Sequence, residues 1–264
     1  MRVSQIMTPN VITVDKDVSL VDAIDRMRRH EISRLVVVDA GRVEGIITER
    51  DIVRELGSMR SYRLSLGRIH VSNVMTTNPI TVAPDLTAKR AAEIMLEHDI
   101  SGLPVVERDK LVGIVTKTDF AKVCAGFEDI YVGQVMQSSP RTISPYDRVI
   151  HVRRLLLDED LISLPVLDGN RLVGIVTMRD VAIFFATFQE EVPDKHKSER
   201  IRSLLVEGIM TKPVVTTRTD ARLCDVAREM LERRFSSMPV LNLRDEFVGL
   251  ITKTELTEVA RERL

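Results

Sequence analysis

The chain has 264 residues, in which 38 Lys and Arg nearly balance 39 Asp and Glu, for a formal charge of −1. This length allows about two domains, and the neutral charge excludes a global field that would attract nucleic acid or an anionic membrane. The chain has two cysteines, no apolar run as long as a membrane span and no apolar secretory core at the start. These features predict a cytoplasmic protein without a membrane partner.

The chain repeats one unit four times. Each copy opens with an apolar residue and a methionine, at Ile6-Met7, Val74-Met75, Val135-Met136 and Ile209-Met210. A short predicted strand follows at residues 11–14, 79–82, 140–143 and 214–217. These strands carry the corresponding threonines Thr13, Thr81, Thr142 and Thr216.

Apolar residues at helical spacing then predict an amphipathic helix. The spacing is clear in three copies, at Leu20, Ala23, Ile24 and Met27, at Ala88, Ala91, Ala92 and Met95, and at Leu223, Val226, Ala227 and Met230. Asp17, Asp85 and Asp220 lie near the expected helix starts, where acidic residues are favoured.

Each copy continues with a β-rich run, at residues 32–39, 100–107, 161–168 and 235–242. A second strand ends in the motifs GIITERD (45–51), GIVTKTD (113–119), GIVTMRD (174–180) and GLITKTE (249–255), which lead into a helix. The predicted unit is β-α-β-β-α, so the fold class is α+β. One unit buries too little alone, so we expect the first copy to pair with the second and the third with the fourth.

The segments between copies differ in charge. Residues 57–73 contain Arg60, Arg63, Arg68 and His70 and no acidic residue. Residues 186–208 predict a mixed-charge helix interrupted near Pro193. The apolar run at 181–188 predicts a contact between modules.

The recurrent motif has two interpretations. Thr48/Asp51, Thr116/Asp119, Thr177/Asp180 and Thr252/Glu255 have the spacing of a capping box, a structural helix start. However, Arg50, Lys117, Arg179 and Lys253 lie in the first helical turn, where a cation opposes the helix dipole by about 0.3 to 1 kcal/mol. A bound anion would compensate for this cost, as would a nearby acid such as Glu49 or Asp51. The fourfold recurrence favours an anion site.

The order of Met, strand threonine, amphipathic helix, "ISGLPVV" and Gly-apolar-apolar-Thr-x-x-Asp resembles the CBS motif. Four copies, at 6–56, 74–124, 135–185 and 209–260, cover nearly the whole chain. The arrangement is similar to stand-alone archaeal proteins with four motifs and to the γ subunit of AMP-activated protein kinase. The resemblance implies two Bateman modules, at residues 1–125 and 126–264, packed as a disk.

The resemblance also implies four nucleotide clefts, each shared between paired copies. Ribose contacts would come from Asp51, Asp119 and Asp180, beside Thr48, Thr116 and Thr177. The Asp119 cleft would include Thr13, Ile32, Ser33, Arg34 and Lys117, and the Asp51 cleft would include Thr81, Ile100, Ser101, Gly102 and Arg50. The Asp180 cleft would include Thr216, Phe235, Ser236, Ser237 and Arg179, and the Glu255 cleft would include Thr142, Leu161, Ile162, Ser163 and Thr252.

Departures from the family pattern rank these clefts. Glu255 carries an extra methylene where the pattern has Asp, so we expect its cleft to be empty. Arg34 adds a phosphate partner that Gly102 and Ser163 lack, and Arg60 or Arg63 of the linker could add more charge. We therefore rank the Asp119 cleft first.

The resemblance implies a regulatory sensor that binds AMP, ADP or ATP and acts by conformational change on an unidentified protein. We expect no enzyme activity, catalytic cofactor or metal, because no phosphate loop or nucleophile elbow occurs and the five histidines lack metal-ligand spacing. The alternatives are a ligand-free oligomerisation scaffold and a protein that binds S-adenosyl compounds. Association of two chains as a homodimer is compatible with each of these functions. Nucleic-acid binding through residues 60–70 is a further, weaker alternative, because Tyr62 is the only aromatic residue among the charges there.

Overall fold

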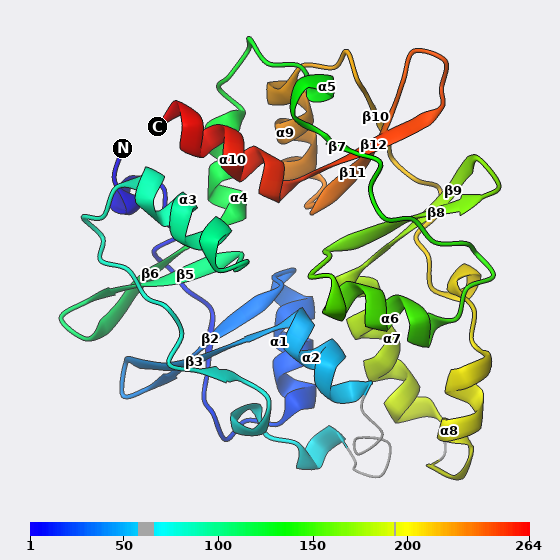
Figure 1. Cartoon of the computed structure of the whole chain (residues 1–264). Helices are drawn as coiled ribbons and strands as arrows, with labels where there is room; N and C mark the ends of the chain where they lie inside the picture. The colour runs from blue at the N-terminus through cyan, green and yellow to red at the C-terminus, as the bar shows by residue number, and fades with distance from the viewer. Residues whose placement is uncertain (58–65, 193) are drawn as a thin grey trace.

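The computed structural model describes residues 1–57, 66–192 and 194–264 (Figure 1). The first repeat contains β1 (Thr13–Val14), α1 (Leu20–His30), β2 (Arg34–Asp39), β3 (Arg42–Thr48) and α2 (Glu49–Leu56). The second contains β4 (Thr76–Thr77), α3 (Ala88–Glu97), β5 (Gly102–Glu107), β6 (Lys110–Thr116) and α4 (Lys117–Cys124). The third contains α5 (Val132–Val135), β7 (Gln137–Ser138), α6 (Val149–Asp158), β8 (Ser163–Asp168), β9 (Arg171–Thr177) and α7 (Met178–Glu191), followed by α8 (Asp194–Ser203). The fourth contains β10 (Thr217–Arg218), α9 (Leu223–Glu232), β11 (Ser237–Leu241), β12 (Phe247–Thr252) and α10 (Lys253–Arg263).

The predicted amphipathic helices are confirmed. Leu20, Ala23 and Met27 of α1 are buried, as are the corresponding apolar residues of α3 and α9. These helices begin three residues beyond the predicted acids, and the hydroxyls of Ser19 and Thr87 each accept a hydrogen bond from an orphan amide at the starts of α1 and α3. The predicted break in the connector is present between α7 and α8, although Pro193 itself lies outside the described residues.

The predicted first strand of each repeat is shorter than expected. Only Thr13–Val14 and Thr217–Arg218 form parallel ladders, with β2 and β11 respectively. In the second and third repeats, single bridges join Val82 to Val105 and Ile143 to Val166. The prolines in this stretch of the sequence lack the amide that a ladder requires, which limits its pairing.

Paired repeats exchange their opening segments. Strand β4 of the second repeat pairs with β3 of the first, and β7 of the third pairs with β12 of the fourth. In return, Thr8 bridges to Ile114 and Thr211 bridges to Ile175. The opening segment of each repeat therefore completes the sheet of its partner.

The exchange explains the glycine of the recurrent motif. A Cβ atom at Gly113 would lie 2.6 Å from Met7 Sδ, and one at Gly45 would lie 2.7 Å from Met75 Sδ. The same contact recurs in the other pair, between Gly174 and Met210 and between Gly249 and Met136. Each motif glycine leaves the space into which the partner's opening methionine packs.

Apolar packing also joins repeats of different pairs. Helix α2 contacts α7, while α4 and α3 contact α10. One hydrophobic core thus contains residues of the first and third repeats, and a second core contains residues of the second and fourth. Phe185 and Phe188 of α7 lie in the first core, which confirms the contact predicted for residues 181–188.

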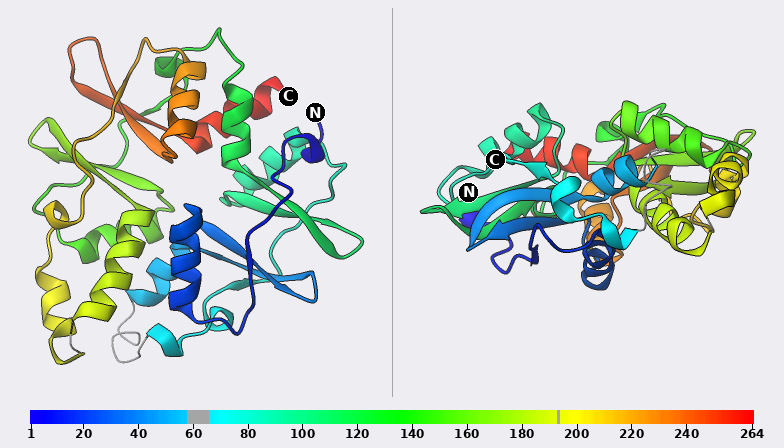
Figure 2. Two further views of the ribbon diagram at one scale, coloured as in Figure 1. Left: turned by 180° about the vertical axis from the view of Figure 1, so that it is seen from behind. Right: turned by 90° about the horizontal axis from the view of Figure 1, so that it is seen from below.

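These contacts arrange the repeats in the order first, second, fourth, third around a flat disk (Figures 1 and 2). Because the cores cross between pairs, the division of the chain into modules after residue 125 remains a prediction. None of the helices in the described residues is long and apolar enough to cross a membrane.

Candidate functional site

All four predicted capping boxes form. Asp119 Oδ2 accepts hydrogen bonds from the amide of Thr116 at 2.8 Å and from its hydroxyl at 2.9 Å. Asp51, Asp180 and Glu255 accept the same pair of bonds from Thr48, Thr177 and Thr252, all between 2.6 and 2.9 Å. Each acid therefore stabilises the start of its own helix through one carboxylate oxygen.

The second carboxylate oxygen has a different partner in each of the three aspartates. Lys122 Nζ lies 2.8 Å from Asp119 Oδ1, and Arg54 Nη1 lies 3.0 Å from Asp51 Oδ1. Asp180 Oδ1 accepts a longer bond, 3.4 Å, from the hydroxyl of Thr211. Because a carboxylate oxygen can accept more than one hydrogen bond, the cap and a ribose contact are compatible at Asp119 if Lys122 shares or leaves its oxygen.

Replacing Asp119 with alanine is expected to destabilise the protein by about 0.5 to 2 kcal/mol, because the cap of α4 is lost. Asp119 is 2 % exposed, so the value should lie towards the upper end of this range. Urea unfolding measures the effect. An unchanged midpoint would contradict the structural role of the box.

The predicted adenine-facing residues lie at the start of each motif helix. In each repeat, the first amide of the motif helix donates to the main-chain carbonyl of the residue just before the central strand, which is β2, β5, β8 or β11. These bonds are Glu49 to Ser33, Lys117 to Ser101, Met178 to Ile162 and Lys253 to Ser236, between 2.9 and 3.1 Å. The segments 32–34, 100–102, 161–163 and 235–237 are therefore held at the helix N-termini of their own repeats.

The side chain of Arg34 reaches from the first repeat to the second. Arg34 begins β2, and its guanidinium donates to the main-chain carbonyl of Ser101 and, at 3.0 Å, to Ser33 Oγ. A Cβ atom at Gly102 would overlap Arg34 Nη1 and would lie 3.1 Å from Thr116 Cγ2. Gly102 thus leaves room for the guanidinium beside Thr116. At the same position of the other pair, the hydroxyls of Ser163 and Ser237 bond to each other at 2.7 Å.

The charge of Arg34 has no close carboxylate. Within the described residues, no acid lies within 4 Å of its guanidinium, whose hydrogen-bond acceptors are neutral. Burial lowers the pKa of Arg34, although the charges of Glu49 and Asp119 oppose this shift. A partly buried cation whose acceptors are neutral is a strong partner for an anion.

Two of the four first-turn cations are compensated by protein acids. Arg50 Nη1 lies 2.5 Å from Asp160 Oδ1 of the third repeat, and Arg179 Nε lies 2.8 Å from Glu49 Oε1 of the first. Burial raises the pKa of Glu49, while Arg179 lowers it. At Arg50 and Arg179 an acid therefore supplies the opposite charge, which was the alternative to a bound anion, although these acids come from across the disk.

The other two first-turn cations meet only hydroxyl groups. Lys117 Nζ donates to Thr254 Oγ1 and Lys253 Nζ donates to Thr118 Oγ1, both at 3.0 Å. In the part of the chain that the structure describes, neither lysine has a carboxylate within 4 Å. Burial lowers the pKa of Lys117. Burial, Arg34 and Arg179 together lower the pKa of Lys253 to about 8.

Replacing Lys253 with methionine is expected to stabilise the protein at pH 7 by about 1 to 3 kcal/mol, because a poorly compensated buried charge is removed. Since the pKa of Lys253 is about 8 in the folded state and its ordinary value is 10.5, the unfolded chain binds more protons between these values. The wild type should therefore gain stability relative to the variant as the pH rises from about 8 to 10. Urea titrations of both proteins across this range measure the difference, and a difference that is constant with pH would contradict the assignment.

The four threonines of the predicted first strands differ in burial. Thr81 and Thr142 are exposed, whereas Thr13 and Thr216 are half-buried. No hydrogen bond joins any of the four to the acid of the partner repeat, within the described ranges. Arg60 and Arg63 lie outside the described residues.

Some residues of the clusters were not predicted. Lys122 could have been anticipated from its position three residues after Asp119, since that spacing brings side chains together on a helix. Thr118, Thr254 and Asp160 carry no comparable sequence signal, because their partners come from other repeats. Among residues 1–57, 66–192 and 194–264, no group of His, Cys, Asp and Glu could hold a metal ion.

The fold and the four motif helices define a protein built from CBS domains. A family model of the CBS domain matches residues 3–58, 71–126, 132–186 and 206–262, so the chain belongs to the CBS domain family.

Among its relatives, the uncharacterized protein MJ1225 of Methanocaldococcus jannaschii is 25 % identical over 97 % of this chain and 96 % of its own length. The crystal structure of MJ1225, a proposed archaeal homologue of γ-AMPK, covers 98 % of this chain and 99 % of that one with a TM-score of 0.86 at 24 % identity. An uncharacterized conserved protein of Pyrococcus horikoshii also shares the fold, with a TM-score of 0.66 at 24 % identity, over 98 % of this chain and all of that one. An inosine-5'-monophosphate dehydrogenase of Korarchaeum cryptofilum is 30 % identical over 64 % of this chain, but the match spans only 38 % of that enzyme.

Proposed function

We propose that the protein is a regulatory sensor that binds an adenosine nucleotide, AMP, ADP or ATP, in the cleft between its first two repeats. The observation that carries the proposal is Arg34, a partly buried cation without a close carboxylate among the described residues, beside Thr116 and in electrostatic range of Asp119. The cleft thus combines a phosphate partner, a helix N-terminus and an acid for sugar hydroxyls. CBS domains commonly bind adenosine-containing ligands, which supports this choice.

The phosphates would meet cations from three repeats. The charges of Arg34 and Arg179 lower the pKa of Lys253 in the fourth repeat, and the charge of Arg34 lowers the pKa of Lys117 in the second. An anion between them would relieve this repulsion and favour the arrangement that holds the cations together. A ligand shifts a population only through such a difference in affinity, and a partner protein would then read the favoured arrangement.

Calorimetric titration of the protein with AMP, ADP and ATP tests the proposal. We expect saturable binding that is weakened in Asp119→Ala, with S-adenosylmethionine as the comparison ligand. Absence of heat with all three nucleotides and with S-adenosylmethionine would remove the sensor function.

The complete capping boxes favour one other function, a ligand-free scaffold in which the motifs only start helices. The thermal shift produced by AMP separates the two functions, because a ligand raises the melting temperature only where it binds the folded state. The sensor predicts a shift in the wild type that Asp119→Ala loses. The scaffold predicts that AMP leaves the melting temperature of each protein unchanged.

The remaining predictions belong to the same proposal. The protein acts without catalysis or a catalytic cofactor, on a partner still to be identified, and a homodimer of disks is compatible with this function.

The free thiols of the protein, Cys124 and Cys224, are both buried, which fits a reducing cytoplasm. Burial raises the pKa of Cys124 to about 12, so this thiol is unreactive.

A further inference from the structure

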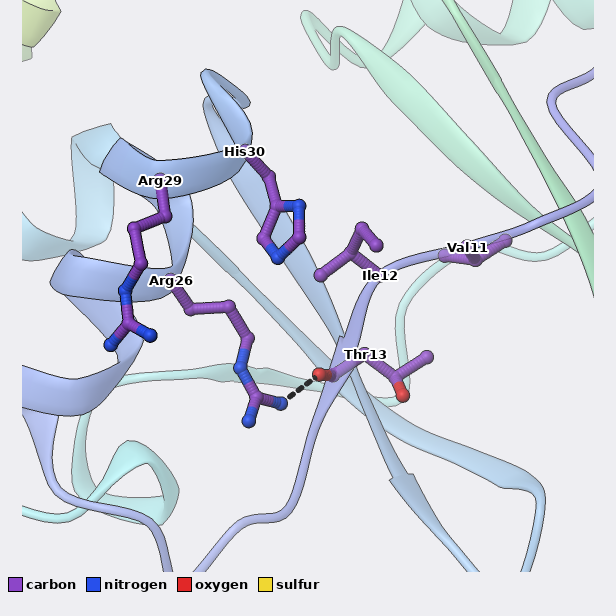
Figure 3. Close-up of a pocket in the computed structure, with 6 residues that line it drawn as sticks. All are labelled: Val11, Ile12, Thr13, Arg26, Arg29 and His30. Carbon is purple, nitrogen blue, oxygen red and sulfur yellow. Dashed lines mark hydrogen bonds between the residues drawn. The ribbon is translucent and has the colours of Figure 1, made fainter.

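A pocket of about 360 Å³ lies between α1 and the strand that precedes it, and it shares Thr13 with the residues predicted for the Asp119 cleft (Figure 3). Val11, Ile12 and Thr13 line one side, and Arg26, Arg29 and His30 line the other. Figure 3 shows Arg26 and His30 pointing from the helix towards the strand, with Arg29 beside Arg26. Arg26 donates to the main-chain carbonyl of Thr13 at 2.6 Å, which holds its guanidinium at the pocket.

The three basic side chains at the pocket lie without acidic partners among the described residues. No ion pair involves Arg26, Arg29 or His30 within the residues that the structure describes, although the adjacent Arg28 pairs with Asp25 at 2.8 Å. Arg26 and Arg29 are three positions apart and share one face of α1 with His30, and the like charges of the two arginines cost a few tenths of a kcal/mol. The pocket therefore concentrates positive charge at some cost.

The fold does not require these cations. The buried residues Leu20, Ala23 and Met27 correspond to Ala88, Ala91 and Met95, to Val149, Val152 and Leu156, and to Leu223, Val226 and Met230. In this alignment, the positions of Arg26, Arg29 and His30 hold Ile94, Glu97 and His98, then Leu155, Asp158 and Glu159, then Glu229, Glu232 and Arg233. Among the four repeats, the first alone has three basic residues at these positions.

A favourable interaction with the helix dipole does not explain the difference. Basic residues near a helix C-terminus are stabilising, and α1 has three in its last turn. However, the helices α3, α6 and α9, which occupy the same place in the fold, have none in theirs. The basic residues are therefore a feature of this pocket in the first repeat, and the fold shared by all four repeats does not need them.

We infer that this pocket is a second anion site, which binds the phosphoryl group of a small phosphorylated molecule. The two guanidinium groups and the imidazole donate hydrogen bonds to phosphate oxygens, as planar cationic donors do in such sites. Val11 and Ile12 offer apolar contact to the rest of the ligand. A concave pocket of this size suits a small molecule better than a duplex or a membrane surface.

The test uses inorganic pyrophosphate, which carries phosphoryl groups but no adenosine. Titrations are made on Arg34→Met, which removes the main phosphate partner of the Asp119 cleft, and on the same protein with Arg26→Gln and Arg29→Gln added. Arg28→Gln with Arg90→Gln is the matched control, since it removes two exposed helical arginines that pair with acids on their own helices. We expect pyrophosphate binding to weaken about tenfold or more in the pocket variant and to stay unchanged in the control.

A second titration with ADP identifies the source of the phosphoryl group. If the pocket variant weakens both ligands, the group belongs to a nucleotide; if it weakens pyrophosphate alone, it belongs to another phosphorylated molecule. Absence of pyrophosphate binding in Arg34→Met, or equal binding by the pocket variant, would overturn the inference. Neither result bears on the adenosine cleft, which is tested separately by AMP binding to the protein with Arg34 intact.

Discussion

Arg34→Met is expected to weaken AMP binding by about 10- to 100-fold, because a hydrogen bond from a charged donor to phosphate contributes about 1.5 to 3 kcal/mol. The same change should leave the free energy of unfolding equal or higher. Arg34 has no carboxylate within 4 Å in the described residues, so its removal orphans no buried acid. Calorimetry measures the affinity, and urea unfolding measures the stability.

Two further variants make this result specific. Gly102→Ala places a Cβ atom on Arg34 Nη1, so it should also weaken AMP binding while leaving the net charge unchanged. Arg90→Met removes an exposed arginine that pairs with Glu93 and Glu97 on its own helix, and it should bind AMP like the wild type. Equal affinity in Arg34→Met and the wild type would show that the guanidinium does not contact the ligand.

Arg179→Met is expected to destabilise the protein by about 1 to 3 kcal/mol, because it leaves the carboxylate of Glu49 without its cation. The side chain of Glu49 is 15 % exposed and that of Arg179 is 38 % exposed, so solvent screening places the loss below that of a fully buried pair. The double variant Glu49→Gln/Arg179→Met should recover part of the loss. A double-mutant cycle by urea unfolding measures the coupling.

The loss in Arg179→Met should also depend on pH. Burial raises the pKa of Glu49 even with Arg179 present, and removing the cation raises it further. Because the folded state then binds the Glu49 proton more tightly than the unfolded state, the penalty should shrink as the pH falls from 7 towards 5. A penalty of the same size at both pH values would contradict the role of Glu49.

The sequence predicted the local structure of each repeat well. The spacing of Leu20, Ala23 and Met27 predicted an apolar helix face, and Thr116 with Asp119 predicted a capping box, because both depend on residues close in the chain. The ordered motif elements in each copy resembled the CBS motif, and the match to the CBS family model confirms that prediction. Paired repeats are explained by the same small size that makes one copy unable to bury a core.

Contacts between repeats were harder to predict. The exchange of opening segments places Met7 on Gly113 and Met75 on Gly45, although only the recurrence of both residue types in every copy hinted at it. Arg50 and Arg179 find their acids across the disk, at separations of more than 100 residues. No spacing rule reaches so far, because the contact of the first repeat with the third depends on how the helices pack.

The crystal structure of the protein with AMP tests the central claim most directly. The account predicts ribose hydroxyls at Asp119 and the phosphate at Arg34, with the guanidinium moved from the carbonyl of Ser101 to the phosphate oxygens. Lys122 should share or leave Asp119 Oδ1. A structure grown with saturating AMP that keeps Arg34 on Ser101 and Lys122 on Asp119, with no nucleotide between the first two repeats, would contradict it.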